Sequence, residues 1–207
     1  RPSEETLNML MDAYPKGLEK KDKEGNLPLH SALEMGDAMP VSVIRRMLEI
    51  YPGACEVKDK EQQLPLHCAW HCAKKSFDEV VLMVLKAGPA AAGVKSKVHN
   101  EYIIHWACRT KTPGFALQLV QAAPAACQLK DVGGNLPMHL CLELGDVMGV
   151  DLIRALLIAF AGCTEVKDKD GNTPLHSAVE HLTTILSEVV KLLLEVGPNA
   201  AKVQDKE

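Results

Sequence analysis

Asn26-Leu27-Pro28-Leu29-His30 is the stretch that decides the fold, because the chain repeats it four more times with small changes. The later copies are Gln63-Leu64-Pro65-Leu66-His67, Glu101-Tyr102-Ile103-Ile104-His105, Asn135-Leu136-Pro137-Met138-His139 and Asn172-Thr173-Pro174-Leu175-His176. Their histidines are 37, 38, 34 and 37 residues apart. A period of this length predicts a solenoid of small stacked units rather than a domain built around one catalytic pocket.

Two helical patterns follow each copy. Pro is tolerated at the first position of a helix, where its fixed φ is already helical, so a short helix is expected from Pro28 to Met35. A second helix is marked by apolar residues at i, i+1, i+4 and i+5, which lie on one helical face. An example is the run Val43, Ile44, Met47 and Leu48. Pro or Gly then ends the second helix, and a polar loop is expected to lead to the next unit.

The units resemble ankyrin repeats, whose signature is an Asp, a Gly tip and a Thr-Pro-Leu-His step that opens a helix pair. Asp22, Asp59, Asp131 and Asp168 each stand eight residues before their histidine, as in that family. The resemblance implies an all-α ankyrin-repeat solenoid of stacked helix pairs joined by hairpin loops. Its expected parts are a leading second helix in 1–21, repeats at 22–58, 59–96, 97–130, 131–167 and 168–204, and the start of a further repeat in 205–207.

The chain departs from the family pattern at several positions. Leu27, Leu64, Leu136 and Tyr102 replace the Thr that caps the first helix, and only Thr173 retains it. The loss of a hydroxyl cap should cost about 1 kcal/mol per helix, offset by apolar packing between neighbours. Gln62 and Asn100 replace the Gly at the hairpin tip. The third repeat has a shorter connection between its two helices than the other repeats. Both ends are cut within a unit, which suggests the ordered part of a longer protein.

Composition excludes several function classes. The net charge of −4 gives no reason to expect nucleic-acid binding through phosphate neutralisation. The longest apolar stretch, Ala155 to Gly162, is far shorter than the ~20 residues needed to cross a bilayer, so no membrane span is expected. Seven cysteines form no regular framework of pairs, which favours an intracellular, reducing compartment.

The stretch His67-Cys68-Ala69-Trp70-His71-Cys72 is the strongest candidate for chemistry, because two His and two Cys could face a metal. A single helix cannot wrap a tetrahedral ion with all four side chains, and His67 is the structural histidine of its repeat. No phosphate-binding loop, nucleophile elbow or pair of catalytic carboxylates occurs. We therefore expect no metal, no cofactor and no catalytic residue, and the chain is not expected to be an enzyme.

The resemblance implies a protein-protein interaction scaffold that binds a partner protein in a concave groove, through its hairpin tips and first helices. Two alternatives remain open: an architectural subunit of a large complex held through its uncapped ends, and a regulatory module of a larger enzyme. The candidate contact residues form a largely uncharged strip on the middle repeats, with Arg109 and Glu143 beside it. They are His71, Cys72, Val98, His99, Arg109, Thr110, Val132, Gly133, Glu143 and Leu144. Val98, Val132 and Leu144 could instead pack against neighbouring hairpins.

Overall fold

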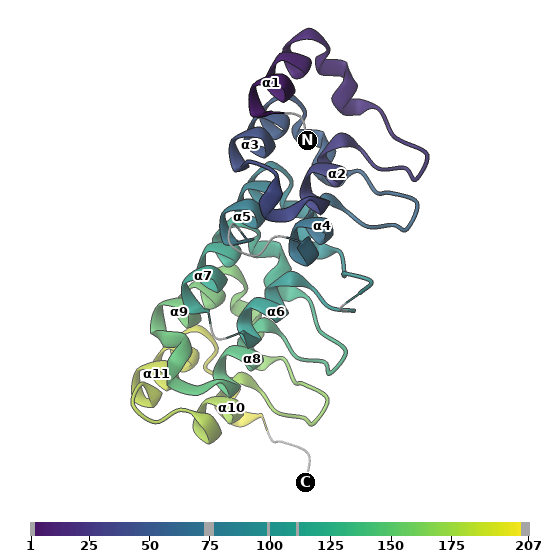
Figure 1. Cartoon of the computed structure of the whole chain (residues 1–207). Helices are drawn as coiled ribbons and strands as arrows, with labels where there is room; N and C mark the ends of the chain where they lie inside the picture. Colours follow the sequence, from purple (N-terminus) through teal and green to yellow (C-terminus); the bar gives the residue numbers. More distant parts are fainter. Residues whose placement is uncertain (1–2, 73–76, 99, 111, 204–207) are drawn as a thin grey trace. The chain divides into compact units, whose positions relative to one another are not determined.

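The computed structural model describes residues 3–72, 77–98, 100–110 and 112–203 (Figure 1). All regular structure in these ranges is α-helix or 3-10 helix, and none of it is strand. The predicted all-α class is therefore confirmed. Within the same ranges, no helix is both long and apolar enough to cross a membrane. The predicted start of a further repeat, 205–207, lies outside the described residues.

The chain divides into two compact units, residues 1–96 and 97–207, at the end of the second predicted repeat. The first unit contains α1 (Glu4–Ala13), α2 (Pro28–Glu34), α3 (Val41–Ile50), α4 (Pro65–Cys72) and α5 (Phe77–Ala87). The second contains α6 (Ile103–Arg109), α7 (Pro113–Ala122), α8 (Pro137–Glu143), α9 (Gly149–Ala159), α10 (Pro174–His181) and α11 (Leu186–Val196).

Each unit is a stack of helix pairs. In the first unit α2 lies beside α4, and α1, α3 and α5 form the second layer. In the second unit α6, α8 and α10 lie side by side, and α7, α9 and α11 form a second layer, to their left in Figure 1. The first helices end close to the predicted positions, since α2 stops one residue before Met35.

An aspartate organises each regular hairpin. In the first repeat, Asp22 Oδ1 accepts hydrogen bonds from the N–H groups of Glu24 and Asn26, both at 2.8 Å. The Asp22 N–H donates to the Asn26 carbonyl at 2.9 Å, which closes the turn. Asp59, Asp131 and Asp168 make the equivalent carboxylate bond to the residue four positions later. The aspartate of the family signature therefore satisfies backbone donors at the hairpin tip.

Neighbouring hairpins are joined in a row within each unit. The Lys21 Nζ donates to the Lys58 carbonyl, and the Lys130 Nζ donates to the Lys167 carbonyl, both at 2.8 Å. A backbone bond also links the hairpins of the fourth and fifth repeats, where the Lys169 N–H donates to the Gly133 carbonyl at 3.2 Å. These bonds connect residues about one repeat apart and fix the spacing of adjacent hairpins.

The repeated histidine lies in the first turn of the first helix, and its side chain accepts a hydrogen bond from the N–H of the residue that precedes the helix. The N–H of Leu27 donates to His30 Nδ1 at 3.1 Å, and Leu136 and His139 repeat the bond at the same distance. Since Nδ1 is an acceptor, Nε2 carries the proton, and in His139 it donates to the Val166 carbonyl at 3.1 Å. This role confirms the prediction that the repeated histidines are structural.

The repeated histidine binds the N–H of the capping residue whether that residue is Leu or Thr. The hydroxyl of Thr173, the one Thr retained, contacts His176 Nδ1 at 2.7 Å. Because the histidine binds the N–H of the capping residue in either case, the residue itself is free to be apolar. At three of these positions the residue is a buried leucine, at most 3% exposed: Leu27, Leu64 and Leu136.

The second helix of each repeat is followed by a 3-10 helix. The sequence pattern had predicted only a polar loop at these places. These 3-10 helices are Pro15–Glu19, Pro52–Glu56, Pro89–Gly93, Pro124–Gln128, Ala161–Glu165 and, after a short turn beyond α11, Ala200–Lys202. They pack tightly against the next repeat. A Cβ atom at Gly88 would lie 2.6 Å from Cys55 Cβ, and one at Gly197 would overlap Thr164. These glycines therefore allow repeats to approach closely as well as ending helices.

Gln62 offers a test of backbone strain at a hairpin tip. Its φ is 65°, in the left-handed region that the tip glycine Gly134 occupies at 76°. Gln62→Gly should raise the free energy of unfolding of the first unit by about 0.5–1 kcal/mol, because Gly has no Cβ to clash there. The measurement is urea unfolding followed by Trp70 fluorescence in a Trp106→Phe background. Gly134→Gln, followed through Trp106, is the reverse control and should destabilise; a neutral or harmful Gln62→Gly would contradict the strain.

Candidate protein-interaction surface

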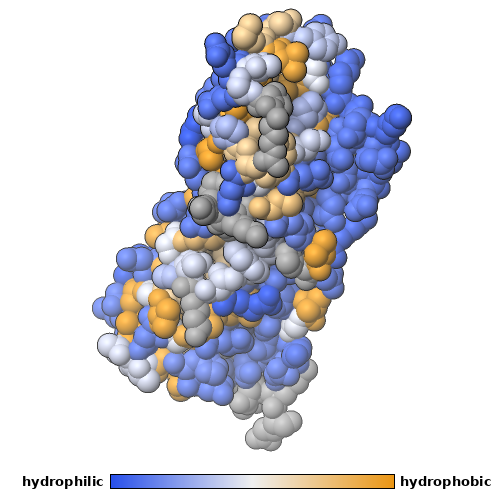
Figure 2. Space-filling view, in the orientation of Figure 1, coloured by the Kyte–Doolittle hydropathy of each residue, from blue (hydrophilic) through white to orange (hydrophobic). Residues whose placement is uncertain are grey.

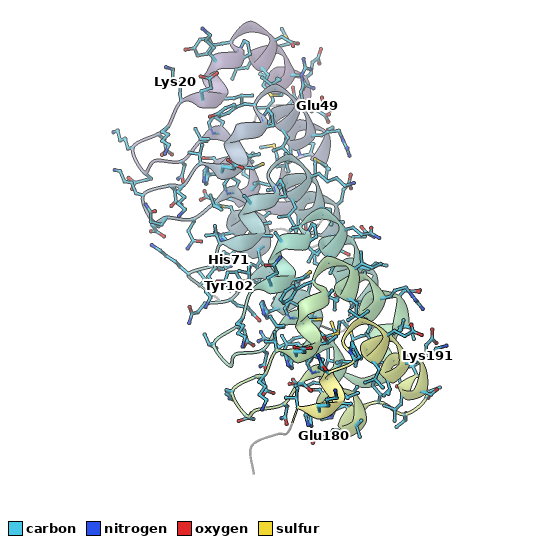
Figure 3. The ribbon with its side chains drawn as sticks, turned by 180° about the vertical axis from the view of Figure 1, so that it is seen from behind. Lys20, Glu49, His71, Tyr102, Glu180 and Lys191 are labelled. Carbon is cyan, nitrogen blue, oxygen red and sulfur yellow. The ribbon has the colours of Figure 1, made fainter. Side chains whose placement is uncertain are left out.

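The first unit supplies two of the predicted contact residues, at the end of α4. His71 is exposed, and its Nε2 lies 3.4 Å from Ser96 Oγ. Figure 3, which shows the back of the molecule as seen in Figure 1, labels His71. Cys72 is half-buried, and burial raises the pKa of its thiol. The predicted contact residue His99 lies outside the described residues.

Two of the four possible zinc ligands in α4, His67 and Cys68, are poorly suited to bind a metal. His67 uses both ring nitrogens, since Nδ1 accepts from the Leu64 N–H at 3.0 Å and Nε2 lies 3.2 Å from the Val94 carbonyl. Cys68 is buried, which raises the pKa of its thiol to about 12 and disfavours the thiolate that binds metal. Among the described residues, no three His, Cys, Asp or Glu side chains are placed to hold an ion.

The second unit presents two valines on its hairpin tips. Val98 is 71% exposed and Val132 is 77% exposed, so the expectation that they pack against neighbouring hairpins is wrong for both. Leu144, which caps the end of α8, is half-buried. Figure 2 shows hydrophobic patches that interrupt the mostly hydrophilic hairpins. The two valines have no packing role that would explain an apolar residue at the tip.

Arg109 forms an ion pair that was not predicted from the sequence. Its Nη2 donates to Glu101 Oε2 at 2.6 Å, and the Glu101 side chain is 8% exposed. Burial raises the pKa of Glu101, the charge of Arg109 opposes that shift, and Asp131 adds to it. The other oxygen, Oε1, has no hydrogen-bond partner within the described part of the chain. Arg109 therefore compensates a buried carboxylate, and its removal would leave that charge unpaired.

The predicted strip is more acidic than its sequence indicated. Burial raises the pKa of Glu143, and the charges of Asp168, Asp131 and Glu180 raise it further, while His181 lowers it. Two of these carboxylates are the aspartates that organise hairpins, so their second effect is to surround the end of α8 with negative charge. Figure 3 labels Glu180 on α10, and Lys191 lies on α11, away from the hairpins.

Two of the remaining predicted residues have structural roles. Gly133 donates its N–H to Asp131 Oδ1 at 2.8 Å, and a Cβ atom there would lie 2.9 Å from the Asn135 amide nitrogen. The Thr110 hydroxyl donates to the Ala107 carbonyl at 3.0 Å, which closes the end of α6. The exposed surface of this face in the second unit therefore carries apolar valines at the tips and is acidic around Glu143.

Comparison with known proteins agrees with this architecture. A family model for ankyrin repeats matches residues 104–206 in three copies. The crystal structure of the ankyrin-repeat protein EF0377 is similar, with a TM-score of 0.62 and 19% identity over 90% of this chain and 87% of that one. An ankyrin-repeat domain from Acinetobacter baumannii gives a TM-score of 0.60 with 18% identity over 93% of both chains.

The ankyrin-repeat domain of Bcl-3, a member of the IκB protein family, is also similar, with a TM-score of 0.54 and 23% identity over 86% of this chain and 75% of that one. At such identities the likeness shows the fold. No curated protein sequence compared with the chain matches it significantly. Residues 104–206 are therefore ankyrin repeats by sequence, and the chain has the ankyrin-repeat fold over most of its length.

Proposed function

We propose that the chain is a non-enzymatic protein-interaction scaffold, and that its second unit binds a partner protein through the hairpin face. This face is made of the hairpin tips with Val98 and Val132 and the last turns of α6, α8 and α10. Ankyrin repeats are a general protein-interaction module, which supports the broader part of the proposal. The finer part rests on one observation, the exposure of both valines beside charged residues.

The charges on the hairpin face indicate the chemistry of the partner. Around the end of α8, Glu143, Asp131, Asp168 and Glu180 are negative, and the charge of Arg109 is neutralised by Glu101. The exposed Lys97 and Lys169 lie at the hairpin tips, away from this acidic side. Complementary potentials favour association, so the proposed partner segment combines apolar side chains for the two valines with Lys or Arg for the acidic side. Nucleic acid, with its negative phosphates, is not an expected ligand.

We also infer that the chain functions in a reducing compartment. All seven cysteines are unpaired, and six are buried. Burial raises the pKa of Cys55, Cys127 and Cys163 to about 12, so these thiols pack as small apolar groups. This chemistry needs no oxidising environment.

Photocrosslinking tests the hairpin face while the identity of the partner is still open. A benzophenone amino acid at position 132 should crosslink a protein that the same group at Ile158 does not, since Ile158 is 81% exposed on α9. The captured protein is then purified and titrated against the Val98→Asp, Val132→Asp double variant. We expect binding about tenfold weaker or more, with an unchanged melting temperature, because both side chains face solvent.

The ion pair of Arg109 decides which substitutions are useful. Arg109→Asp is unsuitable because it would place a second carboxylate against buried Glu101 and destabilise the unit. A partner that binds the valine variant as tightly as the native chain, or that crosslinks only from position 158, would contradict the proposal.

A further inference from the structure

An apolar groove of about 360 Å³ lies between α7 and α9, in the layer of second helices of the second unit. We call this groove and its edges the α7–α9 surface. Its lining residues come from α7, α9 and the 3-10 helix that follows α7, and they are Val120, Gln121, Pro124, Ala155, Ile158 and Ala159. Ile158 is 81% exposed, so a large apolar side chain projects into solvent at the edge of the groove.

The other second helices have a polar residue at the position of Ile158. Counted back from the residue that ends each helix, these residues are Asp12, Glu49, Lys86, Gln121 and Glu195. All five are exposed, so the packing of a repeat does not require an apolar side chain at this position. A single exposed isoleucine is common on protein surfaces, and its surroundings decide whether it has a role.

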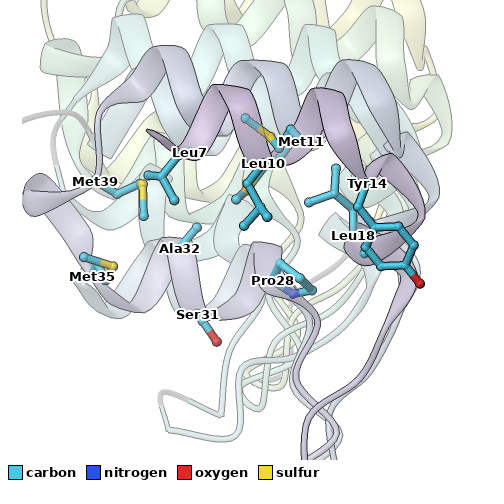
Figure 4. Close-up of a pocket in the computed structure, with 12 residues that line it drawn as sticks. Leu7, Leu10, Met11, Tyr14, Leu18, Pro28, Ser31, Ala32, Met35 and Met39 are labelled. Atoms are coloured by element: carbon cyan, nitrogen blue, oxygen red, sulfur yellow. The ribbon is translucent and has the colours of Figure 1, made fainter. Parts of the chain in front are cut away.

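A second apolar groove, between α1 and α2 in the first unit, is of a different kind (Figure 4). Leu10 lines it and has the position in α1 that Leu156 has in α9. Leu156 is 2% exposed because the first helix of its repeat, α8, packs against α9. The groove beside α1 therefore consists of surface that lies inside a repeat elsewhere in the chain. Ile158 has an outward position in a repeat whose two helices are both present.

The sequence around the α7–α9 surface is free of charge over a long stretch. Residues 113–128, which form α7 and the next 3-10 helix, contain no Asp, Glu, Lys or Arg, and neither do residues 155–164 of the following repeat. The corresponding residues 41–56 of the first repeat contain Arg45, Arg46, Glu49 and Glu56. Depletion of charged residues is typical of the core of a protein interface.

Charged residues lie beside this uncharged region on α9. Asp151 is exposed near the start of the helix, and Arg154, one turn before Ile158, pairs with Glu188 of α11 at 3.4 Å. Arg154 is therefore already neutralised within the unit. A charged segment placed in the groove would lose hydration without finding a counter-ion among its lining residues. The occupant is therefore expected to present an uncharged and largely apolar surface.

The shape of the surface favours a second copy of the chain as that occupant. The groove is hollow and Ile158 projects at its edge, so a surface that covers both needs a projection and a hollow side by side. The same surface on another copy has both features and is equally free of charge. In a two-fold arrangement each Ile158 would enter the groove of the other copy, because such an interface uses one patch twice.

We propose that the second unit associates with a second copy of the chain, as a weak two-fold dimer, through the α7–α9 surface. Two helices offer a surface at the small end of specific interfaces, so the expected dissociation constant is about 20–200 µM. The hairpins of this unit extend from the side of the first helices, away from α7 and α9 (Figure 1). Each copy would keep its hairpin face free, and the dimer does not depend on the function proposed for that face.

Sedimentation equilibrium of the chain over about 5–300 µM measures the association. Ile158→Glu should weaken it about tenfold or more, because each copy then brings a charge into an apolar groove. Gln121→Glu, on the α7 side of the groove, should act in the same way. Both changes suit the helices, since Glu49 and Glu195 occupy this position in α3 and α11.

Val132→Glu is the matched control for these variants. Val132 is 77% exposed at a hairpin tip, so the same kind of change there should alter the dissociation constant less than about twofold. Urea unfolding followed by Trp106 checks that each variant folds. It is measured at about 1 µM, where the expected affinity leaves the chain mostly monomeric.

Photocrosslinking from position 158 identifies the occupant directly. Protein with a benzophenone amino acid at this position is mixed with isotope-labelled native chain at about 200 µM, irradiated and analysed by mass spectrometry. We expect crosslinks between unlabelled and labelled chains that end within residues 113–128. The same protein in a cell extract shows whether a different protein takes this place.

Other results would contradict the dimer. A chain that stays monomeric at about 300 µM, or a dimer that Ile158→Glu leaves intact, would overturn the proposal. Crosslinks confined to one chain would show that the surface is covered from within. Crosslinks to a different protein in the extract, with none between copies of the chain, would assign the surface to that partner and would also overturn the proposal.

Discussion

Leu156→Ala should lower the free energy of unfolding of the second unit by about 3–4 kcal/mol, because it removes a large side chain from a packed interface and leaves a cavity. Leu156 is 2% exposed in the middle of α9, between α7 and α11. Its counterpart Leu10 is 62% exposed, so Leu10→Ala should cost less than about 1 kcal/mol in the first unit. The same substitution at the same repeat position thus has different effects according to whether a first helix covers it.

Each unit has its own fluorescent reporter for this comparison. Trp106 lies in the second unit and Trp70 in the first, so Trp70→Phe and Trp106→Phe backgrounds isolate the two transitions. Ile158→Ala is the control on α9 itself and should change the free energy by less than about 0.5 kcal/mol, since Ile158 is 81% exposed. Equal effects of the changes at 156 and 158 would show that α9 is packed differently.

Acidification from pH 6.5 to about 5 should destabilise both units steeply. Burial lowers the pKa of His30, His67, His105 and His139 below the ordinary value of 6.5. Below pH 6.5 the unfolded chain therefore binds protons that the folded chain does not. Their contribution to stability is complete above that pH and decreases as the pH falls towards the lowered values.

The size of the effect follows from the number of protons taken up on unfolding. Each histidine contributes up to about 1.4 kcal/mol per pH unit, so the two histidines of each structural unit give at most about 2.8 kcal/mol per pH unit. The measurement is the urea midpoint and slope at several pH values. His139→Gln should reduce the pH slope of the second unit by about one proton.

Three carboxylates with raised pKa values act in the opposite direction at lower pH. Burial raises the pKa of Glu34, Glu101 and Glu143 above 4.5, so the folded chain binds these protons first, and the pH slope should flatten as they titrate. Constant stability between pH 6.5 and 5 would contradict the neutral, hydrogen-bonded state of the histidines.

The helix positions and the structural histidines could be predicted because their causes are local. Pro at the first helical position and apolar residues at i and i+4 act within one or two turns. The argument against a metal site in α4 used the same helical geometry and stays a prediction. The 3-10 helices were missed because Pro and Gly mark the end of an α-helix without specifying the conformation of the next residues. Their packing depends on Gly88 and Gly197, whose lack of a Cβ matters only against the next repeat.

The candidate surface was predicted less well, because its electrostatics depend on side chains from different repeats. Arg109 and Glu101 are eight residues apart, and only the folded hairpin brings them to 2.6 Å. The sequence held one signal: Glu101 stands where Asn26, Asn135 and Asn172 stand in other repeats. A carboxylate in place of an amide there required a nearby cation. The acidic surroundings of Glu143 had no comparable signal, since Asp131 and Asp168 were assigned only to the hairpins.

The lysine row along the hairpins limits how this chain can change in length. Lys130 reaches the carbonyl of Lys167, one complete repeat later, and Lys21 reaches that of Lys58 in the same way. A tandem duplication of residues 131–167 would reproduce the donor and its acceptor at the new junction, so the array could grow without breaking a contact. An insertion of any other length between them would shift the acceptor out of register. Evolution and protein engineering can therefore lengthen this part of the array most readily in steps of one whole repeat.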